Sequence, residues 1–257
     1  MIKLNDVSFK YGNNTVLSDI SLDFEIPKLY GIIGPNGSGK TTLLNIISRQ
    51  LKMQSGELLF DNVPYDAFSR NEFAKKVAFL PQHLTKSQMT VRDFVSFGRF
   101  PHLGLSKKLS QNDENIVDEQ LYRTDTAHLS QKQMCNLSGG EQQRAHIAMV
   151  LSQDTPYIML DEPTSFLDVS SKFDLFKKLN IIKNKQKCII TVIHDITLAL
   201  RFCDSIILLN NGKLVKAGTP DDIISDNCLD DVFNVTCKKI SIGKQTEYII
   251  CPKEVDA

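Results

Sequence analysis

Residues 34–41 read GPNGSGKT, in which Gly34, Gly39, Lys40 and Thr41 follow the spacing GxxxxGK and then Ser or Thr. Glycines let the backbone approach an anion closely enough for amide groups to point at phosphate oxygens. A helix beginning here adds its positive end. We interpret the segment as a nucleotide phosphate loop, with Lys40 on the β- and γ-phosphates and the Thr41 hydroxyl on Mg²⁺. The plain alternative is a glycine-rich turn between a strand and a helix.

Two adjacent carboxylates follow a second apolar run, because residues 157–163 read YIMLDEP. In a parallel sheet, such a strand end lies at the same edge as a phosphate loop. Asp161 is then placed to hold Mg²⁺, directly or through water. Glu162 would orient or deprotonate the attacking water. Taken alone, the DEP segment would be a solvated turn.

A third segment, residues 137–144, reads LSGGEQQR and precedes the apolar-periodic stretch AHIAMVLSQ. Ser138 and Glu141 have the spacing of a capping box, so the simplest interpretation is a helix start. Gly139 and Gly140 are poor helix formers, however, and weaken the helix there. Their use would be to leave backbone amides open to an anion at the positive helix end.

The elements that would position these residues are indicated by the apolar pattern. Residues 2–9 and 16–24 alternate, as half-buried antiparallel strands do. Continuous apolar runs, typical of central strands in a parallel sheet covered on both faces, occupy residues 29–33, 77–80, 157–160, 188–193 and 206–209. Residues 41–51 have helical spacing. Strand-like runs are missing from residues 84–137, which predicts an inserted helical subdomain, and the tail predicts a hairpin turning near Gly243.

The composition fits one large α/β domain, or one domain with an inserted subdomain, in 257 residues. Thirty basic and thirty acidic residues balance, which gives no indication of wholesale nucleic-acid binding. No apolar run approaches 18 residues, and the first residues read as a strand rather than a signal peptide. The six cysteines show no CxxC pair, so we expect reduced thiols and assign them no metal.

The three segments in this order resemble the ATP-binding cassette, or ABC, proteins, and the resemblance covers about residues 2–225. It implies a fold class: α/β, a P-loop NTPase (RecA-like) core with an antiparallel β subdomain and an inserted α-helical subdomain. The core would be residues 1–83 and 145–225, the helical subdomain with the LSGGE signature residues 84–144, and a short C-terminal extension residues 226–257.

The resemblance also implies roles for four further residues. Tyr11 looks like the aromatic that stacks on adenine. Gln82, in AFLPQ, is similar to the glutamine that reaches Mg²⁺ and the water and links the core to the insert. Asp168, in SFLD, resembles the aspartate of the dimer-contact loop, and His194 resembles the switch histidine at the γ-phosphate. Each residue taken singly would more often be structural.

In this family the signature helix of one copy contacts the γ-phosphate held by a second copy, so two ATP molecules are sandwiched in a head-to-tail pair. The catalytic residues would be Glu162, His194 and Gln82, and the Mg²⁺ ligands Thr41, Gln82 and Asp161. The ATP contacts implied are Tyr11, Gly34, Pro35, Asn36, Gly37, Ser38, Gly39, Lys40, Thr41 and Thr42, completed by Ser138, Gly139, Gly140, Glu141 and Asp168 of the second copy.

The transported solute is indicated by residues 90–102, TVRDFVSFGRFPH. This segment resembles the corresponding stretch in the ATPases of iron-siderophore, haem and cobalamin importers. Iron-siderophore import is the first choice; the alternatives are haem, cobalamin or another solute, an exporter, a soluble non-transport ABC ATPase, or a P-loop kinase. The resemblance implies permease subunits as partners, indirectly a substrate-binding protein, no nucleic acid, and a peripheral location on the cytoplasmic face of the inner membrane.

One feature of the importer match has two interpretations, and two others depart from the common pattern. The apolar positions Val91, Phe94, Val95 and Phe97 fall mostly on one helical face, and either pack inside the insert or form a docking groove. Phe166 is bulkier than the small residue common in many dimer-contact loops, and AHIAMVLSQ departs from the common arginine- and alanine-rich helix.

Overall fold

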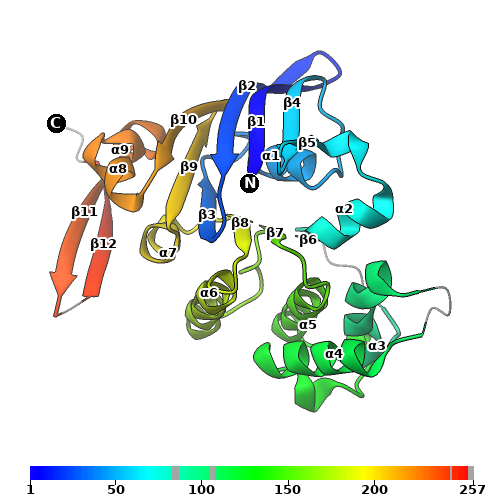
Figure 1. Cartoon of the computed structure of the whole chain (residues 1–257). Helices are drawn as coiled ribbons and strands as arrows, with labels where there is room; N and C mark the ends of the chain where they lie inside the picture. The colour runs from blue at the N-terminus through cyan, green and yellow to red at the C-terminus, as the bar shows by residue number, and fades with distance from the viewer. Residues whose placement is uncertain (83–86, 105–107, 244, 254–257) are drawn as a thin grey trace. The chain divides into compact units, whose positions relative to one another are not determined.

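The alternating strands expected near the start of the chain are present in the computed structural model (Figure 1). The structure describes residues 1–82, 87–104, 108–243 and 245–253. Packing divides the chain into one unit of residues 1–65 and 183–257 and a second unit of residues 66–182. The predicted domain boundary at residues 83 and 84 lies outside the described residues, and the predicted subdivision by role stays a prediction.

An antiparallel sheet forms the first layer of unit one. β1 (Ile2–Tyr11) pairs with β2 (Asn14–Phe24) on one side and with β4 (Ser55–Phe60) on the other, and β5 (Val63–Pro64) follows β4. Ile2, Leu4 and Val7 are buried while the residues between them are more exposed. The alternation in the sequence therefore corresponds to one apolar and one solvated face.

Parallel strands form the second layer of this unit. β3 (Lys28–Ile33) pairs in parallel with β8 (Cys188–Val192) and with β9 (Ser205–Asn210), and β10 (Lys213–Gly218) closes the edge antiparallel to β9. All five residues of β8 are buried. The continuous apolar runs in the sequence are thus confirmed as buried parallel strands.

Helix α1 (Lys40–Ile47) leaves β3 directly after the phosphate loop, and α7 (Ile196–Phe202) follows β8. α1 is shorter than the predicted helix over residues 41–51. It ends early because Arg49 adopts a left-handed backbone, with φ 62°, which terminates the helical hydrogen-bond pattern.

The tail adds α8 (Pro220–Ser225), α9 (Cys228–Phe233) and a hairpin of β11 (Val235–Ile242) and β12 (Gln245–Pro252). The predicted hairpin is confirmed, and Gly243 at its turn has φ 63°. Arg201 on α7 pairs with Glu247 on β12 at 2.9 Å, which ties the hairpin to α7 within unit one.

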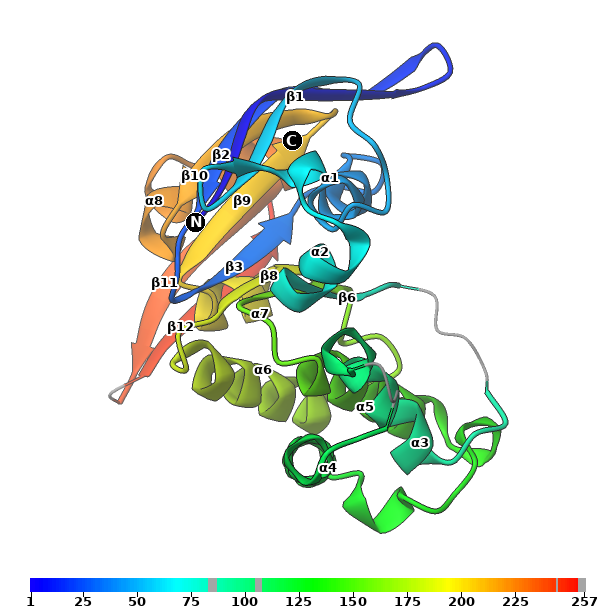
Figure 2. The ribbon, with the colours of Figure 1, turned by 45° about the vertical axis from the view of Figure 1, so that its right-hand side comes forward.

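Unit two begins within η1 (Tyr65–Ala67), continues through α2 (Arg70–Lys76), and pairs β6 (Val77–Leu80) in parallel with β7 (Tyr157–Asp161). Between residues 87 and 137, the described chain holds no named strand, which agrees with the predicted helical insert. Its helices are α3 (Val91–Ser96), η2 (Phe97–His102), α4 (Gln111–Arg123), η3 (Ala127–Leu129) and η4 (Met134–Asn136), followed by α5 (Gly139–Ser152) and α6 (Val169–Lys183) (Figure 2).

The apolar face of α3 lies inside this helical unit. Val91, Phe94 and Val95 are buried in one cluster with residues of α4 and α5, and Phe97 is partly buried against it. Of the two interpretations of these four side chains, packing within the insert is therefore the one that the structure supports.

Candidate functional site

The phosphate loop wraps tightly because its glycines adopt conformations that other residues avoid. Gly37 and Gly39 have φ of 78° and 97°. A Cβ on Gly34 would lie 2.2 Å from the backbone oxygen of Leu209 at the end of β9, and one on Gly39 would lie 2.6 Å from Leu17 Cδ2. These contacts exclude any side chain at both positions, so the sequence pattern is a steric requirement of the loop.

Lys40 and Ser38 put polar atoms inside this loop. The Lys40 Nζ donates to the carbonyl oxygens of Gly34 at 2.9 Å and of Pro35 at 2.8 Å, which holds the ammonium over the loop. Ser38 is 2% exposed, and its hydroxyl oxygen has no hydrogen-bond partner among the described residues. A buried hydroxyl without a partner costs free energy, so it indicates that a ligand atom belongs there.

The start of α1 completes an anion cradle. Its N-cap is Gly39, which has no side chain to cap the helix, and the first turn holds no acidic residue. The first amide groups of a helix have no partner within it, and the dipole there is positive. Together with the Lys40 ammonium and the Ser38 hydroxyl, this donor set fits a polyphosphate.

Two other predicted ATP-site residues of unit one, His194 and Tyr11, lie outside the phosphate loop. His194 is exposed and follows β8. Because β8 runs parallel to β3, it lies at the same sheet edge as the phosphate loop. Tyr11 ends β1 in the antiparallel sheet, is 53% exposed, and meets Phe9 edge-on at a centroid distance of 4.8 Å.

The predicted catalytic and Mg²⁺ residues of unit two lie at the ends of β6 and β7. Asp161 closes β7 and is 2% exposed, and Glu162 follows with a left-handed backbone, φ 50°. The Gln82 amide, just beyond β6, donates to Glu162 Oε1 at 2.8 Å. The parallel pairing of the two strands produces this contact, since it brings their carboxyl ends to one edge. The structure thus brings together the Gln82 and Glu162 side chains, as the sequence predicts for two of the catalytic residues.

The signature segment is a capped helix start. The Ser138 hydroxyl accepts from the Glu141 backbone, and the Glu141 carboxylate accepts from the Ser138 backbone at 2.8 Å. Hydrogen bonds from the Ser138 backbone and hydroxyl hold the pKa of Glu141 below its usual range. The capping interpretation is confirmed, and it leaves Gly139 and Gly140 as the first two residues of α5.

The loop after Glu162 packs on that same helix start. The Gln143 amide donates to the Pro163 carbonyl oxygen at 2.9 Å. A Cβ on Gly139 would lie 3.3 Å from Phe166 Cβ, so only a glycine leaves this contact relaxed. Phe166 is 75% exposed and has φ 64°. The sequence reasoning missed Gln143 and the Phe166 contact, because neither has a motif spacing that marks it.

Asp168 closes the loop and begins the next helix. Its carboxylate accepts from the Ser171 backbone at 2.9 Å and from the Ser171 hydroxyl at 2.8 Å. These two bonds, the backbone one first, lower the pKa of Asp168. The residue is therefore held ionised at the exposed start of α6.

The geometry is that of a P-loop nucleotide site, and comparison with known proteins agrees. The family model for ABC transporters matches residues 17–165, more than half of the chain. The chain belongs to the ABC transporter family. As a member of this family it is an ATP-binding and ATP-hydrolysing subunit, built on the P-loop NTPase core predicted from its sequence.

Relatives of this ABC subunit are import ATPases. The petrobactin import ATP-binding protein YclP of Bacillus subtilis (strain 168) is 38% identical over 247 residues, covering 95% of this chain and 97% of that protein. The ferric enterobactin transport ATP-binding protein FepC of Escherichia coli (strain K12) is 34% identical, covering 88% of this chain and 84% of that protein.

Solved structures share the fold. The dimeric structure of MJ0796, a bacterial ABC transporter cassette, has a TM-score of 0.77 at 29% identity, covering 86% of this chain and 99% of that one. An inward-facing putative metal-chelate type ABC transporter has a TM-score of 0.83 at 21% identity, covering 98% and 96%, and supports the fold alone. No helix within the described part of the ABC subunit is long and apolar enough to cross a membrane.

Proposed function

We propose that this chain is the ATPase of a membrane importer and that it couples ATP-driven pairing of two copies to uptake of an iron-siderophore complex. The proposed coupling of ATP hydrolysis to movement is supported by the hydrogen bond between Gln82 and Glu162. This bond joins the candidate general base to the start of the helical insert. The cargo part is supported by relatives whose names assign them petrobactin, ferric enterobactin and haem. Haem is therefore the alternative cargo with direct support, and cobalamin or another solute stays open.

Each predicted site residue has a separate role in ATP binding or hydrolysis in this proposal. The loop from Gly34 to Thr42 binds the phosphates, Tyr11 stacks on the base, and His194 contacts the γ-phosphate. Glu162 orients and deprotonates the attacking water, and Gln82 holds the Glu162 carboxylate in place. Thr41, Gln82 and Asp161 offer the oxygen ligands that Mg²⁺ prefers, and the ion would neutralise charge on the phosphates.

A second copy completes the site in this proposal. Its Ser138, Gly139, Gly140 and Glu141 would present the open start of α5 to the γ-phosphate, with Asp168 beside them. The amides of the glycine pair are donors for that anion, and the positive end of the α5 dipole adds to them. The Ser138 hydroxyl, which donates to Glu141 within one chain, would turn from that carboxylate to the anion. Such a pair is supported by the dimeric cassette at 29% identity.

Membrane subunits supply the remaining parts. An ATPase of this family needs a permease to carry the solute and, in an importer, a binding protein that delivers it. The chain would lie peripherally on the cytoplasmic face of the inner membrane. Nucleic acid has no part in the proposal, since basic and acidic residues balance at thirty each.

The catalytic assignment is tested by Glu162→Gln. Removing a general base lowers turnover by roughly 10²–10⁴-fold. Because the amide keeps the size of the side chain, ATP affinity stays the same. Glu57→Gln removes an exposed carboxylate of unit one and is the matched control, with turnover expected to be unchanged. Phosphate release and nucleotide binding are measured on the native chain and on both variants. Near-normal turnover of Glu162→Gln would contradict the assignment of Glu162 as the general base.

The cargo assignment needs the intact importer. The chain is co-purified with candidate permease subunits, and ATP turnover is measured with binding protein loaded with a ferric siderophore, with haem or with cobalamin. Stimulation by the ferric siderophore alone is expected, together with loss of growth on siderophore-bound iron after deletion of the gene. Stimulation by haem or cobalamin instead would assign that molecule as the cargo. The absence of any permease partner would favour a soluble ABC ATPase.

A further inference from the structure

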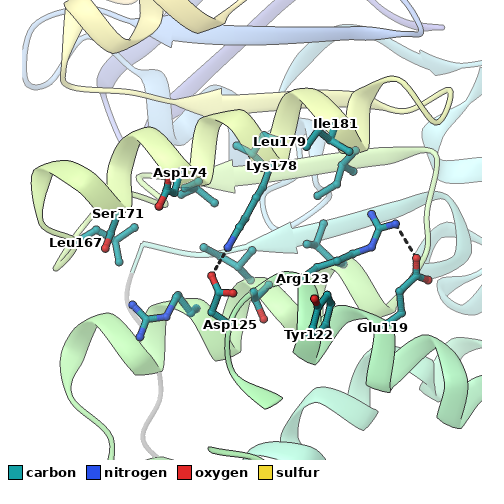
Figure 3. A pocket seen from close by; sticks show the side chains of 16 residues that line it. Glu119, Tyr122, Arg123, Asp125, Leu167, Ser171, Asp174, Lys178, Leu179 and Ile181 are labelled. Atoms are coloured by element: carbon teal, nitrogen blue, oxygen red, sulfur yellow. Dashed lines mark hydrogen bonds and ion pairs between the residues drawn. The ribbon is translucent and has the colours of Figure 1, made fainter. Parts of the chain in front are cut away.

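A cavity of about 690 Å³ opens between α4, α5 and α6 (Figure 3). All of its lining residues belong to unit two, and none of them is among the proposed ATP, Mg²⁺ or catalytic residues. Pockets of roughly 300–1,000 Å³ are the size that holds small organic ligands. The cavity is therefore a candidate binding site separate from the phosphate loop.

Apolar side chains form most of this cavity. Ile147 and Leu151 come from α5, while Leu175, Leu179 and Ile182 come from α6. All five are largely buried from solvent by the surrounding protein. An apolar body that enters the cavity would exchange water for these surfaces, which is favourable in proportion to the area covered.

The rim of the cavity also exposes apolar surface. Tyr122 on α4 is 79% exposed and Ile181 on α6 is 59% exposed, and both line the cavity. Exposed apolar surface next to a cavity is typical of a binding site, because a bound molecule would cover that surface. A molecule whose apolar part reached from the floor to the rim would therefore cover the most apolar surface.

The charged residues around the cavity are mostly paired. Figure 3 shows Arg123 reaching toward Glu119, at 2.7 Å, and Lys178 reaching toward Asp125. Asp174 lies one helical turn before Lys178 on α6, a spacing at which opposite charges stabilise each other. These two basic side chains are thus already neutralised.

Arg144 on α5 is the exception among the basic residues of the cavity. Among the described residues its guanidinium takes part in no ion pair, and its buried Nε makes no hydrogen bond. The neighbouring carboxylate, Glu141, is engaged with Ser138 instead. A guanidinium can only donate hydrogen bonds, so the missing partner is an acceptor, and an anionic one forms the strongest bond.

We propose that the cavity binds a small amphipathic anion, with an apolar ring or short chain on the Ile147–Leu179 side and one carboxylate, sulfonate or phosphate on Arg144. Such a molecule satisfies both features at once: it covers the apolar lining and rim, and it gives the Arg144 guanidinium an anion to pair with. A neutral apolar molecule would leave that cation without an anion, and a cation would meet Arg144 with like charge.

Binding there would also affect turnover, a consequence that rests on the proposed function. α5 begins with Gly139 and Gly140, and α6 follows Asp168, so an occupant between these helices fixes the spacing of two segments proposed to face a second copy. The phosphate loop lies in unit one, outside the cavity lining. Occupancy is therefore expected to change ATP turnover and to leave ATP affinity as it is.

The binding test uses two fluorescent probes that differ in one charge, anilinonaphthalene sulfonate and its uncharged analogue phenylnaphthylamine. Fluorescence titration of the folded chain gives a dissociation constant for each. Arg144→Gln is expected to weaken sulfonate binding by about tenfold or more, the scale of a charge-assisted hydrogen bond, and to leave the uncharged probe within about twofold. Arg144→Lys restores part of the sulfonate affinity.

The location is tested by Ile181→Glu, which places a carboxylate at the exposed rim, and by Val215→Glu, which makes the same kind of change at an exposed position of β10 in unit one. Ile181→Glu is expected to weaken the sulfonate probe and Val215→Glu to have no effect. Thermal melting and ATP binding are measured on each variant, so a misfolded protein is recognised.

Three results overturn the proposal. They are no saturable sulfonate binding to the native chain, equal loss of both probes in Arg144→Gln, and equal behaviour of Ile181→Glu and Val215→Glu. The readout is probe binding, so it does not depend on ATP hydrolysis. Probe binding as expected with no ATP turnover leaves the cavity assignment standing and contradicts the proposed function, and turnover without probe binding does the reverse.

Discussion

Lys40 is held over the phosphate loop by that loop itself. Its ammonium donates to the Gly34 and Pro35 carbonyl oxygens, and the residue is only 6% exposed. The charge is thus positioned by backbone geometry that the loop glycines make accessible. A bound phosphate would meet an ammonium that is already ordered, which lowers the entropic cost of binding.

We therefore expect Lys40→Ala to weaken ATP binding by roughly ten- to a hundredfold, the scale of one charge-assisted hydrogen bond. Lys213→Ala removes an exposed lysine of β10 and serves as the control. Calorimetric titration with ATP measures both. Equal affinity of Lys40→Ala and the native chain would mean that the loop does not bind the phosphates.

At the scale of the elements, the helical insert is joined by a buried ion pair. Arg99 in η2 is 5% exposed and donates through Nε to Asp113 on α4 at 2.9 Å and through a terminal nitrogen to the Ser152 carbonyl oxygen of α5 at 2.8 Å. One side chain therefore links three helical elements. Removing it leaves a buried carboxylate without its cation.

Arg99→Ala is expected to lower the free energy of unfolding by about 3–5 kcal/mol, the usual cost of breaking a buried pair. Arg92→Ala breaks the pair with Asp118, whose carboxylate is 57% exposed, and is expected to cost no more than about 1 kcal/mol. Urea unfolding compares the two. Similar losses in both variants would contradict the role of burial.

The same ion pair predicts a pH dependence. Hydrogen bonds from Ser110 and the Arg99 guanidinium hold the pKa of Asp113 below its ordinary value. A carboxyl whose pKa is lowered by folding stabilises the protein above its unfolded pKa, about 3.9, and this stabilisation is lost as the pH falls through the folded pKa. The difference in unfolding free energy between the native chain and Asp113→Asn should thus be constant above about pH 5 and shrink below pH 4. A difference that stays constant through this range would contradict the assignment.

Short sequence patterns predicted the helices and strands well, but they did not predict the contacts between residues that are far apart in the sequence. The buried strands β6 and β7 follow from apolar runs, and the cap of α5 follows from the spacing of Ser138 and Glu141. The early end of α1 depends on the backbone of Arg49, which no run of apolar residues indicates. The Arg99–Asp113 pair and the Gln143 contact to Pro163 depend on packing, and so does the cavity at Arg144.

For the whole molecule, the proposed function places each ATP site between two chains. Each chain carries a phosphate loop after β3 and a signature helix start at Ser138, and the exposed Phe166 lies beside the latter. The resemblance of the sequence to ABC proteins predicts this division. Its physical basis is an anion cradle in one copy and an open, positive helix start in the other.

The mass of the Glu162→Gln chain in solution tests this claim most directly, because slow hydrolysis lets an ATP-bound pair accumulate. Light scattering after gel filtration should report the mass of two chains with Mg²⁺ and ATP and of one chain without nucleotide. Adding Ser138→Arg, which places a bulky side chain at the helix start, should return the mass to one chain while ATP still binds. A single-chain mass at saturating ATP, or a pair that forms regardless of ATP or of Ser138→Arg, would contradict the account.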